Sequence, residues 1–188
     1  MKLIYEENYS SLYYYGVKFT SDIEIVKDII QELFLELIDS GTRLSNTDNI
    51  RFYLLKALRN KLISHLSHQS RFVQTDSKSV EFNFLDSIEN QLIKTEVEVE
   101  IQNQVRSAVK KLSDKQQEII YLRFYNDLSY PEIATIFKVE MQTVRNLMSR
   151  AIHSLKNDLQ DEIGKSLILM FLKIPRLKKK WLNPFLLN

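Results

Sequence analysis

Residues 128–156 read LSYPEIATIFKVEMQTVRNLMSRAIHSLK and carry the strongest fold signal in the chain. Two helical patterns lie here, separated by a short turn. The first opens with a capping box, because Ser129 and Glu132 have the spacing at which an N-cap and the first helical turn bond reciprocally. Pro131 is tolerated in that turn, since the amide that it lacks would have no partner inside the helix. The sequence therefore predicts one helix that begins after Ser129 and a second that begins after Glu140.

The second helical pattern has two faces of different chemistry. Apolar side chains recur on one face at helical spacing: Val144, Leu147 or Met148, Ala151 and Leu155. The other face carries hydrogen-bonding and cationic side chains: Gln142, Arg145, Asn146, Ser149, Arg150 and His153. No acid occurs from Met141 to Asn157, so this face suits insertion into a DNA groove. We interpret the segment as a helix-turn-helix whose second helix reads DNA.

The composition favours an all-α protein. Of its 188 residues, 44% are hydrophobic, which is enough for one core or two small ones. The chain has only 3 Gly and 3 Pro, abundant Leu, Ile, Lys and Glu, and no sustained period-two run typical of strands. The formal net charge of +2 says little about binding partners.

Several functional classes are excluded by what the sequence lacks. Without cysteine there is no disulfide scaffold and no thiolate metal or redox site. His65, His68 and His153 have no carboxylates at ligand spacing, and no Gly-rich phosphate loop occurs. We therefore expect no catalytic residue, metal, cofactor or small-molecule substrate. The N-terminus acquires acids too early for a signal peptide, and no run reaches the roughly 18 apolar residues that span a bilayer. A cytoplasmic location is expected.

An N-terminal helical domain is predicted over residues 1–68. Its second helix is expected to open with a capping box of Ser21 and Glu24 and to run to about Ile38. The side chains expected in the core from that helix are Val26, Ile29, Ile30, Leu33 and Leu37. A polar loop, residues 40–48, precedes a third helix from about Asn49, whose apolar stripe is Leu55, Leu58, Leu62 and Leu66.

The third helix and the segment after it form a basic run without acids. Its members are Arg51, Lys56, Arg59, Lys61 and Arg71, with His65 and His68. Such a run is typical of a surface that binds a phosphate backbone. A solvated helix face explains an isolated basic helix equally well. A DNA-reading helix elsewhere in the chain favours nucleic acid.

The remaining residues divide into a linker, a second domain and a tail. Residues 69–103 are polar and then acidic, and we interpret them as a flexible linker; a loop between halves of one domain is the alternative. Residues 104–160 are predicted as a four-helix domain that contains the helix-turn-helix and a capping box of Ser113 and Gln116. The tail, residues 161–188, is apolar and basic. It is expected to pack on the preceding domain, to dock on a partner, or to lie on an anionic membrane surface.

Three segments, taken in order, carry a family resemblance. VKDIIQELFLELI from Val26 is similar to a core-binding helix written E-D-x-x-Q-E-x-F-x-x-x-W, and YLLKALRN from Tyr53 is similar to W-L-x-x-I-A-R-N. Residues 128–156 are similar to L-S-Y-x-E-I-A-x-x-L-G-x-S-x-x-T-V-K-S-R-L-x-R-A-x-x-x-L. Together they resemble the small bacterial sigma factors of the extracytoplasmic-function group, over residues 5–160. The resemblance implies two helical domains, regions two and four, and no enzymatic activity. It implies core RNA polymerase and promoter DNA as partners, and leaves open an anti-sigma factor.

The resemblance also implies three sets of site residues. Those expected on the clamp of core polymerase are Asp28, Gln31, Glu32, Phe34 and Leu35. Those expected at the melted minus-ten element, where an extruded base can be read along its Watson–Crick edge, are Arg51, Tyr53, Lys56, Arg59, Asn60 and Lys61, with the loop 40–48. Phe52 and Tyr53 are expected either to stack on bases or to lie in the core. Those expected on the minus-thirty-five duplex are Gln142, Thr143, Arg145, Asn146, Ser149 and Arg150.

Several residues depart from the family pattern. Lys138 replaces the turn glycine, so the turn must take a conformation that a lysine can hold, or bear strain. Glu140 replaces an N-cap serine but keeps the negative charge favoured at a helix start. Other departures are Ile38, Ser64, Ser67 and Leu147. Two alternatives stay open: a helix-turn-helix regulator that is not a sigma subunit, and an interaction protein that no longer binds DNA.

Overall fold

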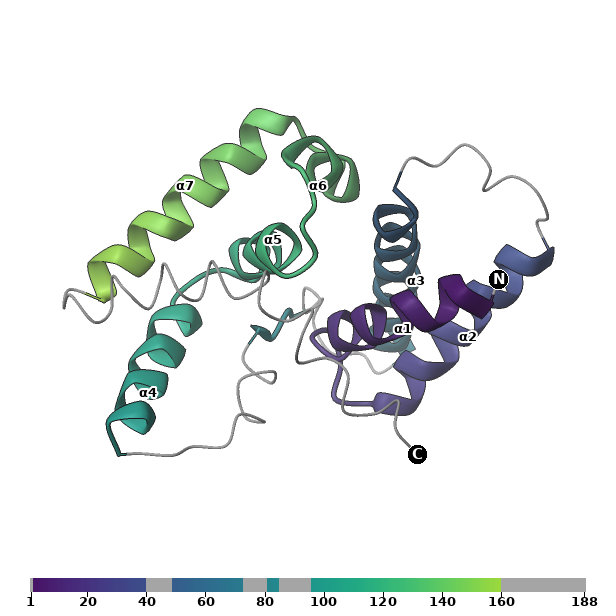
Figure 1. Ribbon diagram of the computed structural model, residues 1–188, viewed down its shortest axis with the longest axis horizontal. Coiled ribbons are helices and arrows are strands. Elements are labelled where there is room, and N and C mark those ends of the chain that lie inside the picture. Colours follow the sequence, from purple (N-terminus) through teal and green to yellow (C-terminus); the bar gives the residue numbers. More distant parts are fainter. Residues whose placement is uncertain (1, 40–48, 73–80, 85–95, 160–188) are drawn as a thin grey trace. The chain divides into compact units, whose positions relative to one another are not determined.

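The computed structural model describes residues 2–39, 49–72, 81–84 and 96–159, and these residues are helical with no strand (Figure 1). The chain forms two compact units, with the boundary between Asn83 and Phe84. Unit 1 contains α1 (Lys2–Gly16), α2 (Ile23–Asp39) and α3 (Ile50–Phe72). Unit 2 contains α4 (Glu96–Lys110), α5 (Asp114–Phe124), α6 (Tyr130–Phe137) and α7 (Met141–Asp158). The all-α prediction is confirmed. Among the described residues, no helix combines the length and the apolar character that a membrane span needs.

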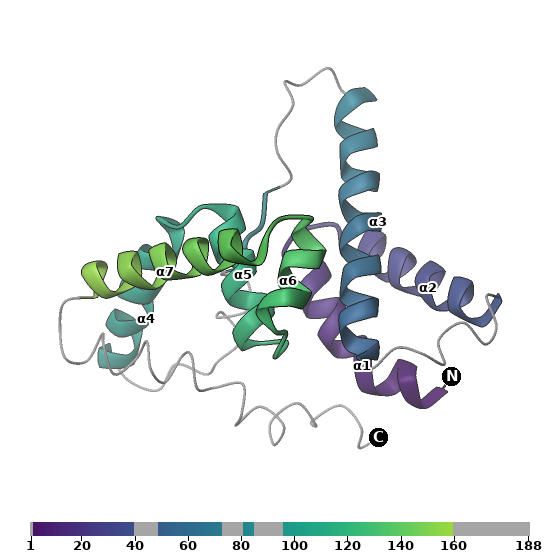
Figure 2. The ribbon, with the colours of Figure 1, turned by 90° about the horizontal axis from the view of Figure 1, so that it is seen from above.

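Unit 1 is a bundle in which each of the three helices packs on the other two. All five side chains predicted for the core from α2 are buried, as are Leu55, Leu58 and Leu62 of α3, whereas Leu66 is only half-buried. Figure 2 shows α3 along its whole length. Gly16 of α1 lies directly against Val26 of α2, because a Cβ added at Gly16 would lie 2.5 Å from Cγ1 of Val26. Only a residue without a side chain fits at that position.

The predicted N-cap of α2 is wrong. Asp22, not Ser21, caps the helix: its Oδ1 accepts hydrogen bonds from the amides of Glu24 at 3.1 Å and Ile25 at 3.3 Å. Glu24 does not complete a box with Ser21 but pairs with Lys27 at 2.8 Å. Both Ser and Asp are good N-cap residues, so sequence spacing alone did not decide between two neighbours. The helix α2 therefore begins one residue later than the predicted N-cap Ser21 would imply.

Unit 2 is built around α7, which packs against α4, α5 and α6. The predicted capping box of α5 is confirmed: the amide and hydroxyl of Ser113 each lie 3.0 Å from Oε1 of Gln116. An ion pair of 2.6 Å joins Lys111, just after α4, to Asp158 at the end of α7. The core includes Leu112, Ile119, Leu122, Ile133 and Val144.

The segment predicted as a polar linker differs from that expectation in its described part. The helix α3 continues to Phe72 and α4 begins at Glu96. Between them, Phe82 is buried in unit 1, with its ring centroid 5.1 Å from that of Phe19. Phe84 is buried in unit 2, 5.5 Å from the ring of Tyr125, and its amide donates to Oε1 of Gln117 at 3.3 Å. Phe82 and Phe84 were the available indication that this segment packs on the two units, but the polar composition around them led to the linker prediction.

Candidate functional site

The helix-turn-helix is formed by α6 and α7, and its first helix begins as predicted. The amide of Ser129 donates to Oε2 of Glu132 at 2.7 Å, and the amide of Glu132 points back to Oγ of Ser129 at 3.5 Å. Pro131 lies in the first turn. The confirmed capping box fixes where α6 starts and therefore how its apolar residues, including Ile133 and Ile136, are buried.

The turn between the two helices shows which backbone conformation Lys138 adopts. Lys138, which replaces the glycine of the sequence pattern that this segment resembles, takes the left-handed conformation, with φ 55° and ψ 46°. A side chain in this region costs about 1–2 kcal/mol. The amide of Val139 donates to the carbonyl of Ala134 at 3.1 Å and closes the turn. Glu140 is the N-cap of α7 but makes no side-chain capping bond, so its contribution is the negative charge near the helix start.

The polar face of α7, which is predicted to read DNA, is exposed, and the apolar face is buried. All six residues predicted to face a duplex are exposed: Gln142, Thr143, Arg145, Asn146, Ser149 and Arg150. Val144, Met148, Ala151 and Leu155 are buried, and Leu147 is half-buried. Nε2 of Gln142 donates to Oδ1 of Asn146 at 3.0 Å. That bond leaves the amide group of Asn146 as an outward donor and Oε1 of Gln142 as an outward acceptor.

The basic helix α3 presents the second predicted set. Asn49 precedes it and accepts a hydrogen bond from the amide of Phe52 at 3.2 Å. Tyr53 is 40% exposed, so it is a surface aromatic and not a core residue. Asn60 is also exposed, and the remaining four residues of the set are half-buried. Nζ of Lys56 lies 5.8 Å from the ring centroid of Phe52, which is close enough for a cation–π contact. The loop 40–48 and the side chain of Arg71 lie outside the described residues.

Lys61 links two sets that the sequence assigned to different partners. Its Nζ lies 2.9 Å from Oε1 of Glu32 and 2.7 Å from Oε1 of Glu36. Burial lowers the pKa of Lys61, but the hydrogen bonds to Glu36 and Glu32 outweigh that effect, so its pKa is raised. Sequence reasoning missed this pairing, because the partners are 25 and 29 residues away.

Four acids follow one another along α2 at intervals of one helical turn: Glu24, Asp28, Glu32 and Glu36. Lys27 pairs with Glu24, and Lys61 pairs with Glu32 and Glu36. Asp28 has no ion-pair partner among the described residues. It is therefore the acid of this row whose charge is left for a basic partner.

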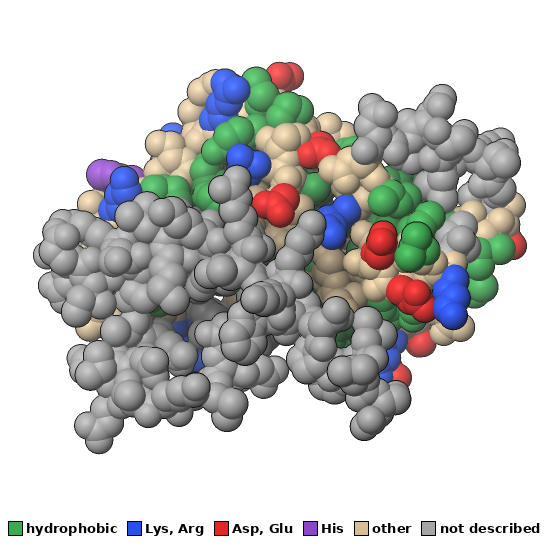
Figure 3. Space-filling view, viewed as in Figure 1, with side chains coloured by type: hydrophobic (Ala, Val, Ile, Leu, Met, Phe, Trp, Pro, Cys, Tyr) green, Lys and Arg blue, Asp and Glu red, His purple; other side chains and the backbone are tan. Residues whose placement is uncertain are grey.

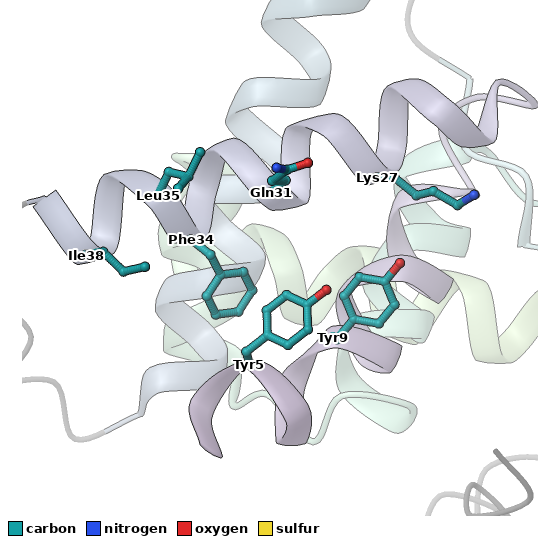
Figure 4. A pocket seen from close by; sticks show the side chains of 7 residues that line it. All are labelled: Tyr5, Tyr9, Lys27, Gln31, Phe34, Leu35 and Ile38. Carbon is teal, nitrogen blue, oxygen red and sulfur yellow. The ribbon is translucent and has the colours of Figure 1, made fainter. Parts of the chain in front are cut away.

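A pocket of about 310 Å³ lies between α1 and α2, beside the acid row (Figure 4). Its lining residues are Tyr5, Tyr9, Lys27, Gln31, Phe34, Leu35 and Ile38. Phe34 is buried, and its ring packs edge-on against Tyr5 at 4.9 Å. Leu35 and Ile38 are 53% and 55% exposed. Figure 3 shows hydrophobic side chains at the surface beside acidic and basic ones where Figure 1 draws α1 and α2.

The pocket adds α1 to the predicted core-binding set. Of that set, Gln31, Phe34 and Leu35 line the pocket, while Asp28 and Glu32 are exposed on the same helix. Tyr5 and Tyr9 were missed, although their spacing of one helical turn was the available signal; their rings lie 5.1 Å apart. The described residues contain no group of three or more side chains that could hold a metal ion.

Comparison with known proteins matches both units in order. The model of Sigma-70 region 2 matches residues 4–72, and that of Sigma-70 region 4 matches residues 102–155. RNA polymerase sigma factor YlaC of Bacillus subtilis is 24% identical over 159 residues, which cover 83% of this chain and 90% of that protein. ECF RNA polymerase sigma factor SigX of the same organism is 20% identical, over 85% of this chain and 83% of that protein.

A solved structure has the same fold. It is the sigma factor RpoE in complex with the anti-sigma factor NepR from Bartonella quintana, with a TM-score of 0.61 and 21% sequence identity. The match covers 86% of this chain and 97% of the other.

Proposed function

The chain belongs to the extracytoplasmic-function group of bacterial RNA polymerase sigma factors, and from this premise we propose how its surfaces divide the task. It binds core RNA polymerase and directs transcription initiation at particular promoters. The observation that carries this function is the match of region 2 to unit 1 and of region 4 to unit 2, in that order. A helix-turn-helix regulator that is not a sigma subunit is not favoured, because it would have no reason to carry region 2.

Unit 2 reads the minus-thirty-five element through α7. Arg145 and Arg150 carry donors suited to guanine or phosphate, while Asn146 and Gln142 carry amides suited to adenine. Thr143 and Ser149 carry hydroxyls that suit phosphate oxygens. This assignment is supported by the exposure of all six side chains and by the absence of acids on the helix up to Asn157.

Unit 1 binds the minus-ten element through α3. Tyr53 is an exposed ring on which an unpaired base can stack, and Asn60 is an exposed amide suited to a base edge. Arg51, Lys56, Arg59 and Lys61 supply positive charge for the backbone. An exposed aromatic residue among cations is the combination that single-stranded DNA requires.

The acid row and the pocket of unit 1 bind the polymerase clamp. Asp28 meets a basic side chain, and Glu32, which pairs with Lys61 but is 58% exposed, adds negative charge beside it. Gln31 supplies hydrogen bonds, and Leu35 adds exposed apolar surface at the rim. Phe34, which is buried, supports Tyr5 from below. The contact therefore combines a small apolar centre with a charged border, as stable interfaces do.

The protein is a binding subunit and not an enzyme, and it acts in the bacterial cytoplasm with the polymerase. A related fold is held by an anti-sigma factor, so a protein of that kind is a further partner to expect. The tail 161–188 and the loop 40–48 lie outside the described residues, and their predicted roles stay predictions.

The decisive experiment is transcription in vitro with core polymerase and this protein as its specificity subunit. We expect discrete transcript starts downstream of a common pair of upstream elements. Core polymerase alone is the control for nonspecific initiation. If the protein leaves the pattern of core polymerase unchanged on genomic templates, the assignment fails.

A further inference from the structure

We propose that Tyr130 positions Arg145 for base reading, so that a residue of α6 helps to set the sequence specificity of α7. This inference rests on the proposed function of α7. Tyr130 is the first residue of α6, directly after the N-cap Ser129. The centre of the Arg145 guanidinium lies 5.9 Å from the ring centroid of Tyr130, within the range of a cation–π contact.

A second arginine fixes the same ring. The guanidinium of Arg123, at the end of α5, lies 5.4 Å from the ring centroid of Tyr130. Nη1 of Arg123 also donates to the carbonyl of Leu128 at 3.0 Å. Arg123 is therefore anchored to the backbone that leads into α6. On the other side of the residue, the capping box of Ser129 and Glu132 fixes the backbone of Tyr130. The ring is thus a supported platform.

The platform leaves Arg145 able to bind DNA. A guanidinium stacks on an aromatic ring through its face, while its N–H donors lie along its edge and bond a base. Arg145 is exposed and forms no ion pair among the described residues. The side chain that it contacts in this part of the chain is the ring of Tyr130. Holding a long side chain before binding lowers the entropic cost of ordering it on the duplex.

Arg150 provides an internal contrast. It lies on the same helix, is also exposed, and has no ring or ion-pair partner among the described residues. Its contribution to binding is therefore independent of Tyr130. Substitutions at Tyr130 are expected to change the contribution of Arg145 to DNA binding and to leave the contribution of Arg150 unaltered.

The test uses polymerase holoenzyme reconstituted with the full chain and a promoter found by mapping transcript starts. Competitor duplexes carry each single base-pair change in the upstream element. Arg145→Ala identifies the base pair whose preference depends on Arg145. We expect Tyr130→Leu to reduce the preference at that base pair by about twofold to fivefold, the size of an exposed cation–π contact. Tyr130→Phe keeps the ring and is expected to keep the preference.

The comparison of duplexes separates positioning from folding. A variant that is partly unfolded binds every duplex less, so its ratio between duplexes does not change. In the Arg145→Ala background, Tyr130→Leu should have no further effect on that ratio, whereas its effect should persist beside Arg150→Ala. Arg123→Met, which leaves Tyr130 in place, should reduce the preference by a smaller factor.

Two results overturn the inference. One is Tyr130→Leu holoenzyme with wild-type discrimination at the Arg145-dependent base pair. The other is a loss of affinity that is equal for all duplexes. If the unaltered protein directs no specific start at all, the proposed function fails instead, so the two failures are distinguishable.

Discussion

Unit 1 and unit 2 each present a basic helix, but the two helices differ in whether their basic side chains form ion pairs within the protein. In α3, Lys61 is held by Glu32 and Glu36 of the neighbouring helix. In α7, neither Arg145 nor Arg150 forms an ion pair within the described residues, and Arg145 lies instead over an aromatic ring. Docking of α7 on a duplex therefore breaks no ion pair of these arginines. A phosphate that binds Lys61 must compete with two carboxylates of the protein itself.

The acid row of unit 1 allows the largest test of this comparison. Charge reversal of Asp28→Lys with Glu32→Lys removes two acids that we propose bind core polymerase and adds two cations that would repel its basic side chains. We expect a loss of about 3 kcal/mol or more in affinity for core polymerase. Co-purification and a binding titration measure it.

Glu7→Lys with Glu81→Lys, two exposed sites of unit 1 outside the pocket, is the control matched for charge, and circular dichroism checks that the fold is retained. Unchanged co-purification of the double variant with core polymerase would contradict the assignment of this surface.

Unit 2 is tested at Arg145. This guanidinium is exposed and pairs with no acid in the part of the chain that the structure describes. Arg145→Ala should therefore cost about 1–3 kcal/mol in promoter affinity if the arginine contacts a base through two hydrogen bonds. The loss should be confined to promoters with one particular base pair. Arg150→Ala is the comparison variant, and a loss for Arg145→Ala that is equal across promoter sequences would assign Arg145 to phosphate.

A smaller effect is expected at the pocket of unit 1. Leu35 is 53% exposed at its rim, and burial of an apolar side chain in an interface stabilises the complex. Leu35→Ala should weaken binding of core polymerase by about 1–2 kcal/mol. Leu3→Ala is a control of the same chemistry, since Leu3 is 66% exposed and does not line the pocket. Equal effects of the two substitutions would remove the pocket from the interface.

The smallest effect is expected from Lys61→Met. The carboxylates that hold Lys61 are more than half exposed, so the ion pairs contribute about 0.5 kcal/mol to the free energy of unfolding. The raised pKa of Lys61 means that this contribution is complete below the ordinary lysine value and is lost as pH rises through the folded-state pKa. Urea unfolding of both proteins at pH 8 and above pH 11 checks it. The difference between them should shrink at the higher pH.

Local signals predicted the fold well, because their causes lie within a few residues. The capping boxes of α5 and α6 depend on residues three positions apart, and both are present. The same logic failed at Ser21, where the neighbouring Asp22 is an equally good cap and took the position. At Lys138 the missing glycine predicted either a conformation that a lysine can hold or strain, and the positive φ shows that the lysine takes the left-handed conformation.

Contacts between distant residues could not be predicted in this way. The pairs of Lys61 with Glu32 and Glu36 depend on how α2 and α3 pack. The pocket required α1, whose tyrosines lie outside the three motifs that carry the family resemblance, to lie beside Phe34. Phe82 and Phe84 are buried because each finds aromatic partners in its own unit, and nothing in the surrounding polar sequence specifies those partners.

Gly16 is expected to influence the width of the pocket between α1 and α2, although it does not line that pocket. Gly16 and Val26 are in tight contact near one end of the helix pair, while Tyr5 and Phe34 lie near the other end. Because close-packed helices transmit strain, one methyl group added at this contact would push α1 away from α2. Since α1 moves nearly as a rigid body, the displacement would extend along its whole length. The opening would grow toward Tyr5. A substitution at Gly16 would in this way change the shape of a binding surface without contacting the partner itself. The absence of a side chain at Gly16 therefore determines the spacing of α1 and α2 along the pocket.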